Sequence, residues 1–110
     1  MSADWMRVIR VGDLKEGQIR LARMGVRQVA VTRVQGRAYA FRNGCPHAGQ
    51  PLHQGRLSGP WIECSRHRWR FDVRDGSCPE HPEYALRCYP SEERDDGWLW
   101  ARATEDDEIW

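Results

Sequence analysis

The sequence predicts an all-β domain, a small antiparallel β-sandwich or barrel with a loop-rich insertion in its middle. Short runs in which apolar and polar residues alternate are separated by turn residues, which is typical of strands. No helix-length amphipathic stretch interrupts them. From about residue 43 to residue 82 the composition changes to glycine, proline, cysteine, histidine and tryptophan. A chain of 110 residues has room for one domain, so we expect residues 1–110 to form a single unit.

Four strands are expected before the insertion, and together they should form an antiparallel sheet. The third is rich in valine, whose β-branched side chain favours extended backbone. Gln35 and Gly36 are expected to link the third and fourth strands as a hairpin turn, and residues 24–27 should form the turn before the third. The expected strands are residues 6–9, 18–24, 28–34 and 37–42.

Four further strands are expected inside and after the insertion. The last of them contains Trp98 and Trp100 at alternate positions, which predicts a structural role for both tryptophans. Turns are expected at Asp75-Gly76 and at residues 95–97. The expected strands are residues 61–63, 68–73, 85–89 and 98–101.

Charge is unevenly distributed although the net charge is only +1. Residues 91–110 contain eight acidic residues against two arginines, so the rest of the chain is strongly basic. The near-neutral balance, and the lack of a basic run with interleaved aromatics, argue against nucleic-acid binding. Residues 104–108 are expected to be a solvated tail, with Ile109 and Trp110 able to pack back onto the domain.

The sequence points to the cytoplasm. No stretch approaches the roughly 20 apolar residues that span a bilayer, and the first residues lack the apolar run of a secretory signal. Thiols are therefore expected to stay reduced, which favours metal binding or burial over disulfide bonds. Cys78 and Cys88 have no histidine at ligand spacing, and we expect them to pack as small apolar residues.

Two cysteine–histidine pairs in the insertion define the candidate metal site. Cys45 lies two residues before His47, and Cys64 lies three residues before His67. Two thiolates and two imidazoles can hold a tetrahedral zinc ion, but zinc sites usually place two cysteines first and two histidines last. Here each half has one of each, which suits a two-iron cluster with thiolates on one iron and imidazoles on the other. The residues alone allow either a zinc ion or a two-iron cluster, and the pattern favours the cluster.

With these motifs the chain resembles a Rieske ferredoxin over nearly all of its length. The glycine, cysteine, proline and histidine of the first loop, and the cysteine and histidine of the second, match the cluster-binding loops of that family. The matching segments are residues 44–47 and 63–67 for the loops, 69–72 and 75–76 for the strand and turn that follow, and 85–90 and 97–100 for the closing strands.

The resemblance implies one Rieske 2Fe–2S cluster per chain, with Cys45, His47, Cys64 and His67 as its ligands and no catalytic residue. It implies a soluble one-electron carrier rather than an enzyme, similar to the ferredoxin components of bacterial ring-hydroxylating oxygenase systems in aromatic hydrocarbon catabolism. A flavin-dependent ferredoxin reductase and a terminal mono- or dioxygenase would be its transient partners. A nucleic acid, a membrane and a small-molecule substrate are not expected.

The resemblance also predicts a low reduction potential. High-potential members of the family join their loops by a disulfide between two extra cysteines, but the corresponding positions here are Gln50 and Arg66. Those members also carry a serine that donates a hydrogen bond to a sulfide, where this chain has Trp69. Fewer donors to the sulfurs stabilise the reduced cluster less, so we expect the low end of the Rieske range of about −150 to +300 mV.

Three other functions stay open from the sequence. The chain can be a small Rieske subunit of a larger reductase complex such as nitrite reductase, although many such subunits lack the full ligand set. A redox or iron sensor and a structural zinc module are the other two.

Several side chains near the loops have ordinary interpretations. His53 and His81 are expected to be surface-loop histidines, and Trp69 is expected to pack as core beneath the cluster. Arginine outnumbers the acidic residues between residues 42 and 74. These arginines are expected either to form a solvated face or to attract an acidic partner.

Overall fold

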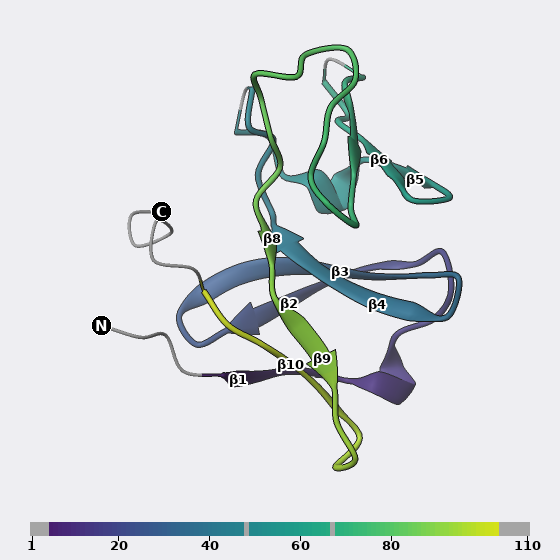
Figure 1. Cartoon of the computed structure of the whole chain (residues 1–110), viewed down its shortest axis with the longest axis vertical. Helices are drawn as coiled ribbons and strands as arrows, with labels where there is room; N and C mark the ends of the chain where they lie inside the picture. Colours follow the sequence, from purple (N-terminus) through teal and green to yellow (C-terminus); the bar gives the residue numbers. More distant parts are fainter. Residues whose placement is uncertain (1–4, 48, 67, 104–110) are drawn as a thin grey trace.

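The architecture is almost entirely β, which confirms the predicted fold class (Figure 1). The structure is a computed structural model and describes residues 5–47, 49–66 and 68–103. None of the helices in these ranges is long and apolar enough to cross a membrane. The elements in order are β1 (Met6–Arg10), η1 (Val11–Asp13), β2 (Ile19–Met24), β3 (Arg27–Val34), β4 (Arg37–Arg42), η2 (Leu52–Gln54), β5 (Arg56–Ser58), β6 (Trp61–Glu63), β7 (Arg70–Asp72), β8 (Cys88–Tyr89), β9 (Ser91–Glu93) and β10 (Trp98–Ala101).

A four-stranded antiparallel sheet in the order β2-β3-β4-β8 lies at the centre of the molecule. The predicted hairpin is confirmed, because β3 and β4 pair up to Val34 and Arg37 across a two-residue turn. Gln35 and Gly36 both have positive φ, 52° and 80°, which is the geometry that matches the twist of the two strands.

The expectation that the first four strands share one sheet is wrong for β1. This strand pairs with β10, and a second sheet in the order β1-β10-β9 results. Val8, Leu99 and Ala101 of this sheet are buried in one apolar cluster with Val29 and Val31 of β3. A strand at residues 6–10 is read correctly from its alternation, but alternation does not specify which partner covers it.

Trp98 and Trp100 lie on the outward face of β10, since Leu99 and Ala101 take the buried positions. Arginines cover both indoles: the guanidinium of Arg7 lies 5.3 Å from the Trp98 ring and 5.5 Å from the Trp100 ring. The two tryptophans are therefore half-buried under arginines rather than part of the core.

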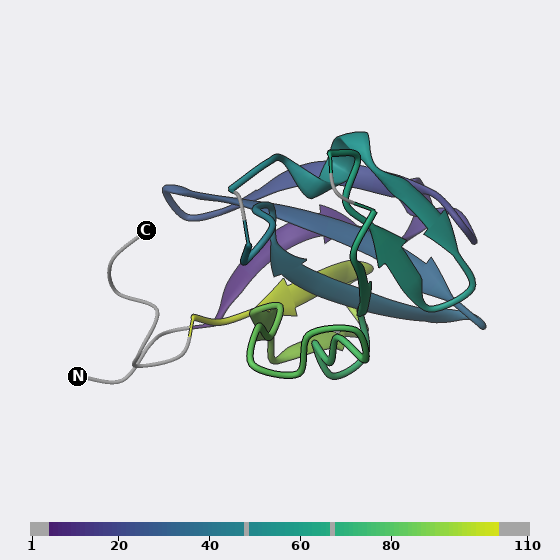
Figure 2. The same ribbon diagram turned by 90° about the horizontal axis from the view of Figure 1, so that it is seen from above.

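A third sheet, β5-β6-β7, lies beyond the opposite face of the central sheet (Figures 1 and 2). A second apolar cluster fills the space between them, and it includes Ala30 and Phe41 from the central sheet with Ile62 and Phe71 from the third sheet. Because successive residues of a strand point to opposite faces, β3 contributes Val29 and Val31 to one core, and Ala30 and Val34 to the other.

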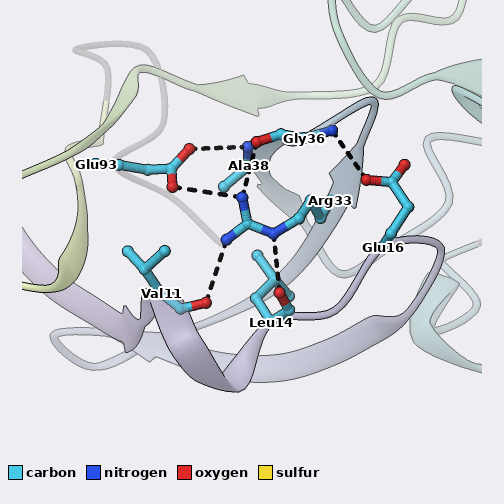
Figure 3. A network of polar contacts seen from close by, with 7 residues as sticks. All are labelled: Val11, Leu14, Glu16, Arg33, Gly36, Ala38 and Glu93. Carbon is cyan, nitrogen blue, oxygen red and sulfur yellow. Dashed lines mark hydrogen bonds and ion pairs between the residues drawn. The ribbon is translucent and has the colours of Figure 1, made fainter.

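A buried arginine network ties β3 to the segment that follows β1 (Figure 3). The Arg33 side chain is only 14% exposed. Its guanidinium donates to the carbonyls of Leu14 and Gly36, at 2.8 Å each, and to that of Val11 at 3.2 Å. Glu93 lies 3.4 Å away and also accepts the Ala38 amide. One side chain thus satisfies three backbone carbonyls and joins three parts of the chain.

Two short strands, β5 and β9, were not predicted, and two predicted strands are shorter than expected. Residues 68–73 form a strand only over Arg70–Asp72, and residues 85–89 only over Cys88–Tyr89. Both shortened ends lead into loops closed by specific backbone hydrogen bonds. The predicted tail at residues 104–108, with Ile109 and Trp110, lies outside the described residues.

Candidate metal centre

The first candidate loop follows β4 and is closed by hydrogen bonds at Cys45. The Cys45 amide donates to the Gln50 carbonyl at 2.8 Å, and the Gly49 amide donates to the Cys45 carbonyl at 2.7 Å. Asn43 fixes the base of the loop, because its side-chain oxygen accepts the His53 amide at 2.8 Å and its nitrogen lies 2.9 Å from Nδ1 of the same histidine.

The second loop, between β6 and β7, repeats this pattern. The Cys64 amide donates to the Trp69 carbonyl, and the Arg68 amide donates to the Cys64 carbonyl, both at 2.9 Å. In each loop the cysteine amide therefore bonds to the carbonyl five residues on, and its carbonyl accepts the amide four residues on. The two loops therefore have the same pattern of backbone hydrogen bonds, although their cysteine–histidine spacings differ.

The fourth residue after each cysteine has a left-handed backbone. In the first loop this residue is Gly49, with φ of 76°, and in the second it is Arg68, with φ of 62°. Glycine adopts this conformation without strain, whereas a residue with a Cβ pays about 1 kcal/mol or more for it. Arg68 and Gln35 are the non-glycine residues with positive φ in the part of the chain that the structure describes.

Both thiols lie in the second apolar core. Cys45 is 3% exposed and Cys64 is fully buried, and the two belong to one cluster of packed residues with Leu52, Ile62 and Phe71. All four cysteines of the chain are described, and none forms a disulfide bond. The fold therefore brings the two predicted thiol ligands to the same side of the β5-β6-β7 sheet.

His47 lies at the surface and packs against the second loop. Its ring stacks on the Trp69 indole, with centroids 4.0 Å apart and planes 24° from parallel. The other predicted imidazole ligand, His67, lies outside the described residues. The contact between His47 and Trp69 places the ends of the two loops against each other.

A third segment, residues 77–85, completes the stack. His81 packs on the other face of Trp69 at 3.5 Å, and Tyr84 meets the edges of both Trp69 and His47. Gly76 closes the base of this segment: its carbonyl accepts the Leu86 amide at 2.8 Å, and a Cβ on Gly76 would lie 2.1 Å from the Leu86 carbonyl oxygen. Only glycine allows this approach, and its φ of 85° also requires glycine.

Sequence reasoning missed the roles of two histidines. His81 was expected in a surface loop, but it is half-buried against Trp69. His53 was likewise expected at the surface, but it is partly buried and holds Asn43. Trp69 is also half-buried rather than core, because it lies between two histidine rings at the edge of the molecule. Stacking between loops distant in sequence leaves no periodic signal that could have revealed these roles.

Cys78 and Cys88 pack as expected. Cys78 is 2% exposed, and Cys88 is hydrogen-bonded through Sγ to the Val73 carbonyl at 3.4 Å. Burial raises the pKa of both thiols, and that of Cys88 to about 12. A thiol with so high a pKa stays protonated near neutral pH when no metal is bound.

Two of the arginines near the loops are paired with carboxylates. The hydrogen bonds of Arg74 hold the pKa of Asp72 below its usual range, because the Asp72 carboxylate accepts both the side chain and the amide of Arg74. The Arg70 guanidinium likewise lowers the pKa of Glu80, with Nε 3.0 Å from a carboxylate oxygen. The Arg70–Glu80 pair links β7 to the third segment, whereas the Arg74–Asp72 pair joins the end of β7 to the turn that follows it.

The donor set fits a mixed thiolate–imidazole iron–sulfur centre. Two buried thiols and one surface imidazole stand on two loops with the same pattern of backbone hydrogen bonds, so each loop can contribute one sulfur and one nitrogen ligand. Buried thiols and an exposed imidazole, that of His47, are compatible with the division of ligands in a Rieske cluster.

Known proteins are similar to this chain in both sequence and fold. A family model described as the Rieske [2Fe-2S] domain matches residues 4–90. The ferredoxin component of the naphthalene 1,2-dioxygenase system of Pseudomonas putida is 33% identical over 76 residues, which are 69% of this chain and 73% of that protein. A chain in the solved complex of reduced oxygenase and oxidised ferredoxin of carbazole 1,9a-dioxygenase is 30% identical, with a TM-score of 0.78 over 92% of this chain and 97% of that one.

A weaker similarity points to a larger enzyme. Nitrite reductase [NAD(P)H] of Emericella nidulans is 25% identical over 114 aligned positions, which cover 92% of this chain but only 10% of that protein.

Proposed function

The chain belongs to the Rieske [2Fe-2S] domain family, and from this membership we propose that it carries single electrons from a flavin-dependent reductase to a terminal mono- or dioxygenase. The family's domain holds one Rieske 2Fe–2S cluster. The observation that carries the proposal is the pair of matching loops, which bury Cys45 and Cys64 and leave His47 at the surface. The oxygenase systems named for the similar ferredoxins support this choice of partner.

We assign the ligands as Cys45, His47, Cys64 and His67, within one domain whose cluster-binding part spans about residues 43–82. A bound cluster supplies a site that takes up and releases one electron, and its imidazole ligands raise the potential above that of an all-cysteine cluster. All iron positions are then filled by protein and sulfide. The chain is therefore an electron carrier and not an enzyme.

The protein's own residues would keep the structural change on electron uptake small. The packed core around Cys45 and Cys64 excludes water, and the closing hydrogen bonds hold each cysteine backbone in place. Stacking on Trp69 fixes the plane of His47. Since His47 is exposed, a partner protein can approach the imidazole directly. We place this carrier in the cytoplasm, where its four thiols stay reduced.

Anaerobic reconstitution with iron and sulfide tests the assignment. The protein should become brown and give an EPR signal only after reduction, and Cys64→Ser should abolish both. Cys78→Ser is the matched control, since Cys78 is an equally buried thiol in the same core, and it should keep the cluster. A colourless protein that binds one zinc ion would refute the proposal.

The nitrite reductase similarity supports a second candidate, a small Rieske subunit of a larger reductase. The two candidates differ in how long the chain stays with its partner. Size-exclusion chromatography of a lysate of the source cells, followed by immunodetection, should find a transient carrier near its monomer mass of 12.9 kDa. Stable elution with a reductase at several times this mass would favour the subunit.

A further inference from the structure

An unpaired group of arginines flanks the second cluster-binding loop. Arg56 on β5 and Arg66 and Arg68 in the loop are all exposed. Within the described ranges none of the three has an ion pair with a carboxylate, whereas Arg70 and Arg74, only a few residues later, both do. Positive charge is therefore left uncompensated at this end of the molecule.

Arg56 and Arg68 line a hollow of about 450 Å³ that reaches Cys64 and Ser65. Glu63 also lines it, and this residue is paired in register with Arg56 on β5 and with Arg70 on β7. The lining thus includes two guanidinium groups against one carboxylate, which leaves a net positive charge, and it also includes Cys64, a predicted cluster ligand. A group bound there would lie beside the cluster.

The backbone at Arg68 gives an independent reason to assign this side chain a role. The equivalent residue in the first loop is Gly49, which takes the same conformation without strain and has the same hydrogen bond. The second loop keeps a long cationic side chain in a conformation that favours glycine. Strained backbone conformations cluster at functional sites.

The carboxylates at the opposite end of the molecule are mostly paired with arginines. In the β9–β10 hairpin, at the lower end of Figure 1, Glu92, Glu93 and Asp96 lie 2.6, 3.4 and 3.5 Å from Arg94, Arg33 and Arg7, respectively, whereas β5 and β6 lie at the upper end. The arginine group at the loop end lacks such pairs within the described ranges. An acidic partner is attracted to this end first.

We propose that the hollow between Arg56 and Arg68 binds carboxylate side chains of an acidic segment on the oxygenase that accepts the electron. The proposal rests on the proposed function and adds a docking residue and a partner chemistry to it. Guanidinium groups bind carboxylates through paired hydrogen bonds, and a partner held at this hollow has its redox centre close to the second loop.

Charge variants of the reduced, cluster-containing protein test the docking surface against haem proteins of known charge. The variants are Arg56→Glu and Arg68→Glu, with Lys15→Glu as the control. Lys15 is exposed like the arginines but lies in the segment between η1 and β2, outside the β5-β6-β7 sheet. Stopped-flow measurements give the rate of electron transfer to acidic cytochrome b5 and, for contrast, to basic cytochrome c at low and high salt.

At about 20 mM salt, each arginine variant should transfer electrons to cytochrome b5 at least about tenfold more slowly than the wild type. The difference should disappear near about 500 mM salt, where charges are screened beyond a few ångströms. Transfer to cytochrome c should become faster, and Lys15→Glu should stay within about twofold of the wild type with both acceptors. Equal slowing by Arg68→Glu and Lys15→Glu would overturn the proposal, because it would show an effect of net charge only.

Arg68→Gly separates the side chain's role from stability. The variant removes the charge and relieves the backbone strain, so it should slow transfer to cytochrome b5 about threefold or more while its unfolding midpoint stays equal or rises. An unchanged rate in Arg68→Gly would also overturn the docking role. If the wild type forms no cluster, or reduces neither haem protein, then the proposed function itself fails, and this result is distinct from both of the others.

Discussion

Replacing Arg33 by methionine should destabilise the fold more than any other single loss of an arginine at the surface. Methionine keeps much of the length of the side chain but has no hydrogen-bond donor. The change removes a donor from the carbonyls of Leu14, Gly36 and Val11, of which Val11 keeps the Leu14 amide as a donor, and it leaves Glu93 without its ion pair.

The magnitude follows from the two partly buried hydrogen bonds, those to Leu14 and Val11. Hydrogen bonds to a charged group contribute about 1.5–3 kcal/mol each, whereas an exposed ion pair such as that with Glu93 adds about 0–1 kcal/mol. Arg33 is 14% exposed, so water can replace only part of what is lost. We therefore expect Arg33→Met to lower the free energy of unfolding by about 3–5 kcal/mol, a large fraction of the roughly 5–15 kcal/mol of a domain of this size.

Urea unfolding followed by tryptophan fluorescence measures this difference, with Arg20→Met as the control. Arg20 is exposed and donates one long hydrogen bond, 3.4 Å, to the Asp13 carbonyl. Its loss should cost no more than about 0.5 kcal/mol. The cluster-free protein is the cleaner sample, because metal binding adds to the stability of the loaded form. A cost below about 1 kcal/mol for Arg33→Met would refute the view that this network holds β3 to the η1 segment.

Four further outcomes follow from the site and its surroundings. Arg74 lowers the pKa of Asp72, so as the pH falls the unfolded chain takes up this proton before the folded protein does. The stabilisation is thus present above about pH 4 and is lost below it, and urea unfolding at pH 7 and pH 3 should show a steeper loss in the wild type than in Asp72→Asn. Trp69→Leu removes the stacking of the indole on His47, so it should lower the free energy of unfolding by about 2–4 kcal/mol and speed the loss of visible absorbance on warming. Trp69→Phe keeps an aromatic ring and should lose less than half as much stability. Iodoacetamide at pH 8 should leave Cys88 unmodified in the folded protein, as mass spectrometry would show, since its pKa of about 12 keeps the thiol protonated; rapid labelling would contradict the burial. Redox titration at pH 7 should give a midpoint below 0 mV, towards the low end of the Rieske range, and a clearly positive midpoint would contradict the reasoning from Trp69 and the missing loop disulfide.

Local patterns predicted the strands well and their partners poorly. The β3–β4 hairpin follows from two alternating runs around Gln35 and Gly36, because a two-residue turn leaves only one possible pairing. β1 has no such turn to β2, and its pairing with β10 depends on contacts between the two ends of the chain. Strands β5 and β9 were missed because Arg56–Ser58 has one apolar residue and Ser91–Glu93 has none, so neither shows the alternation of a strand.

The candidate site was predictable in its chemistry and less so in its surroundings. The cysteine and histidine spacing indicated which residues to examine, although His67 lies outside the described residues. The equivalence of the two loops is a property of backbone hydrogen bonds, and the different spacing of their histidines hides it in the sequence. The stack of His47, Trp69 and His81 joins three segments that are far apart in the chain, so no local pattern could predict it.

Packing on both faces of the central sheet holds the loops that carry Cys45 and Cys64 in place. Along β3, Val29 and Val31 face the core shared with β1 and β10, whereas Ala30 and Val34 face the core that holds Cys45 and Cys64, the two proposed ligand cysteines. Arg33 fixes the same strand to the η1 segment. A displacement of Cys45 or Cys64 would therefore have to disturb a strand that is packed on both faces. An electron carrier benefits from this arrangement. The barrier to electron transfer rises with the reorganisation energy, which is larger when atoms around the site move as its charge changes.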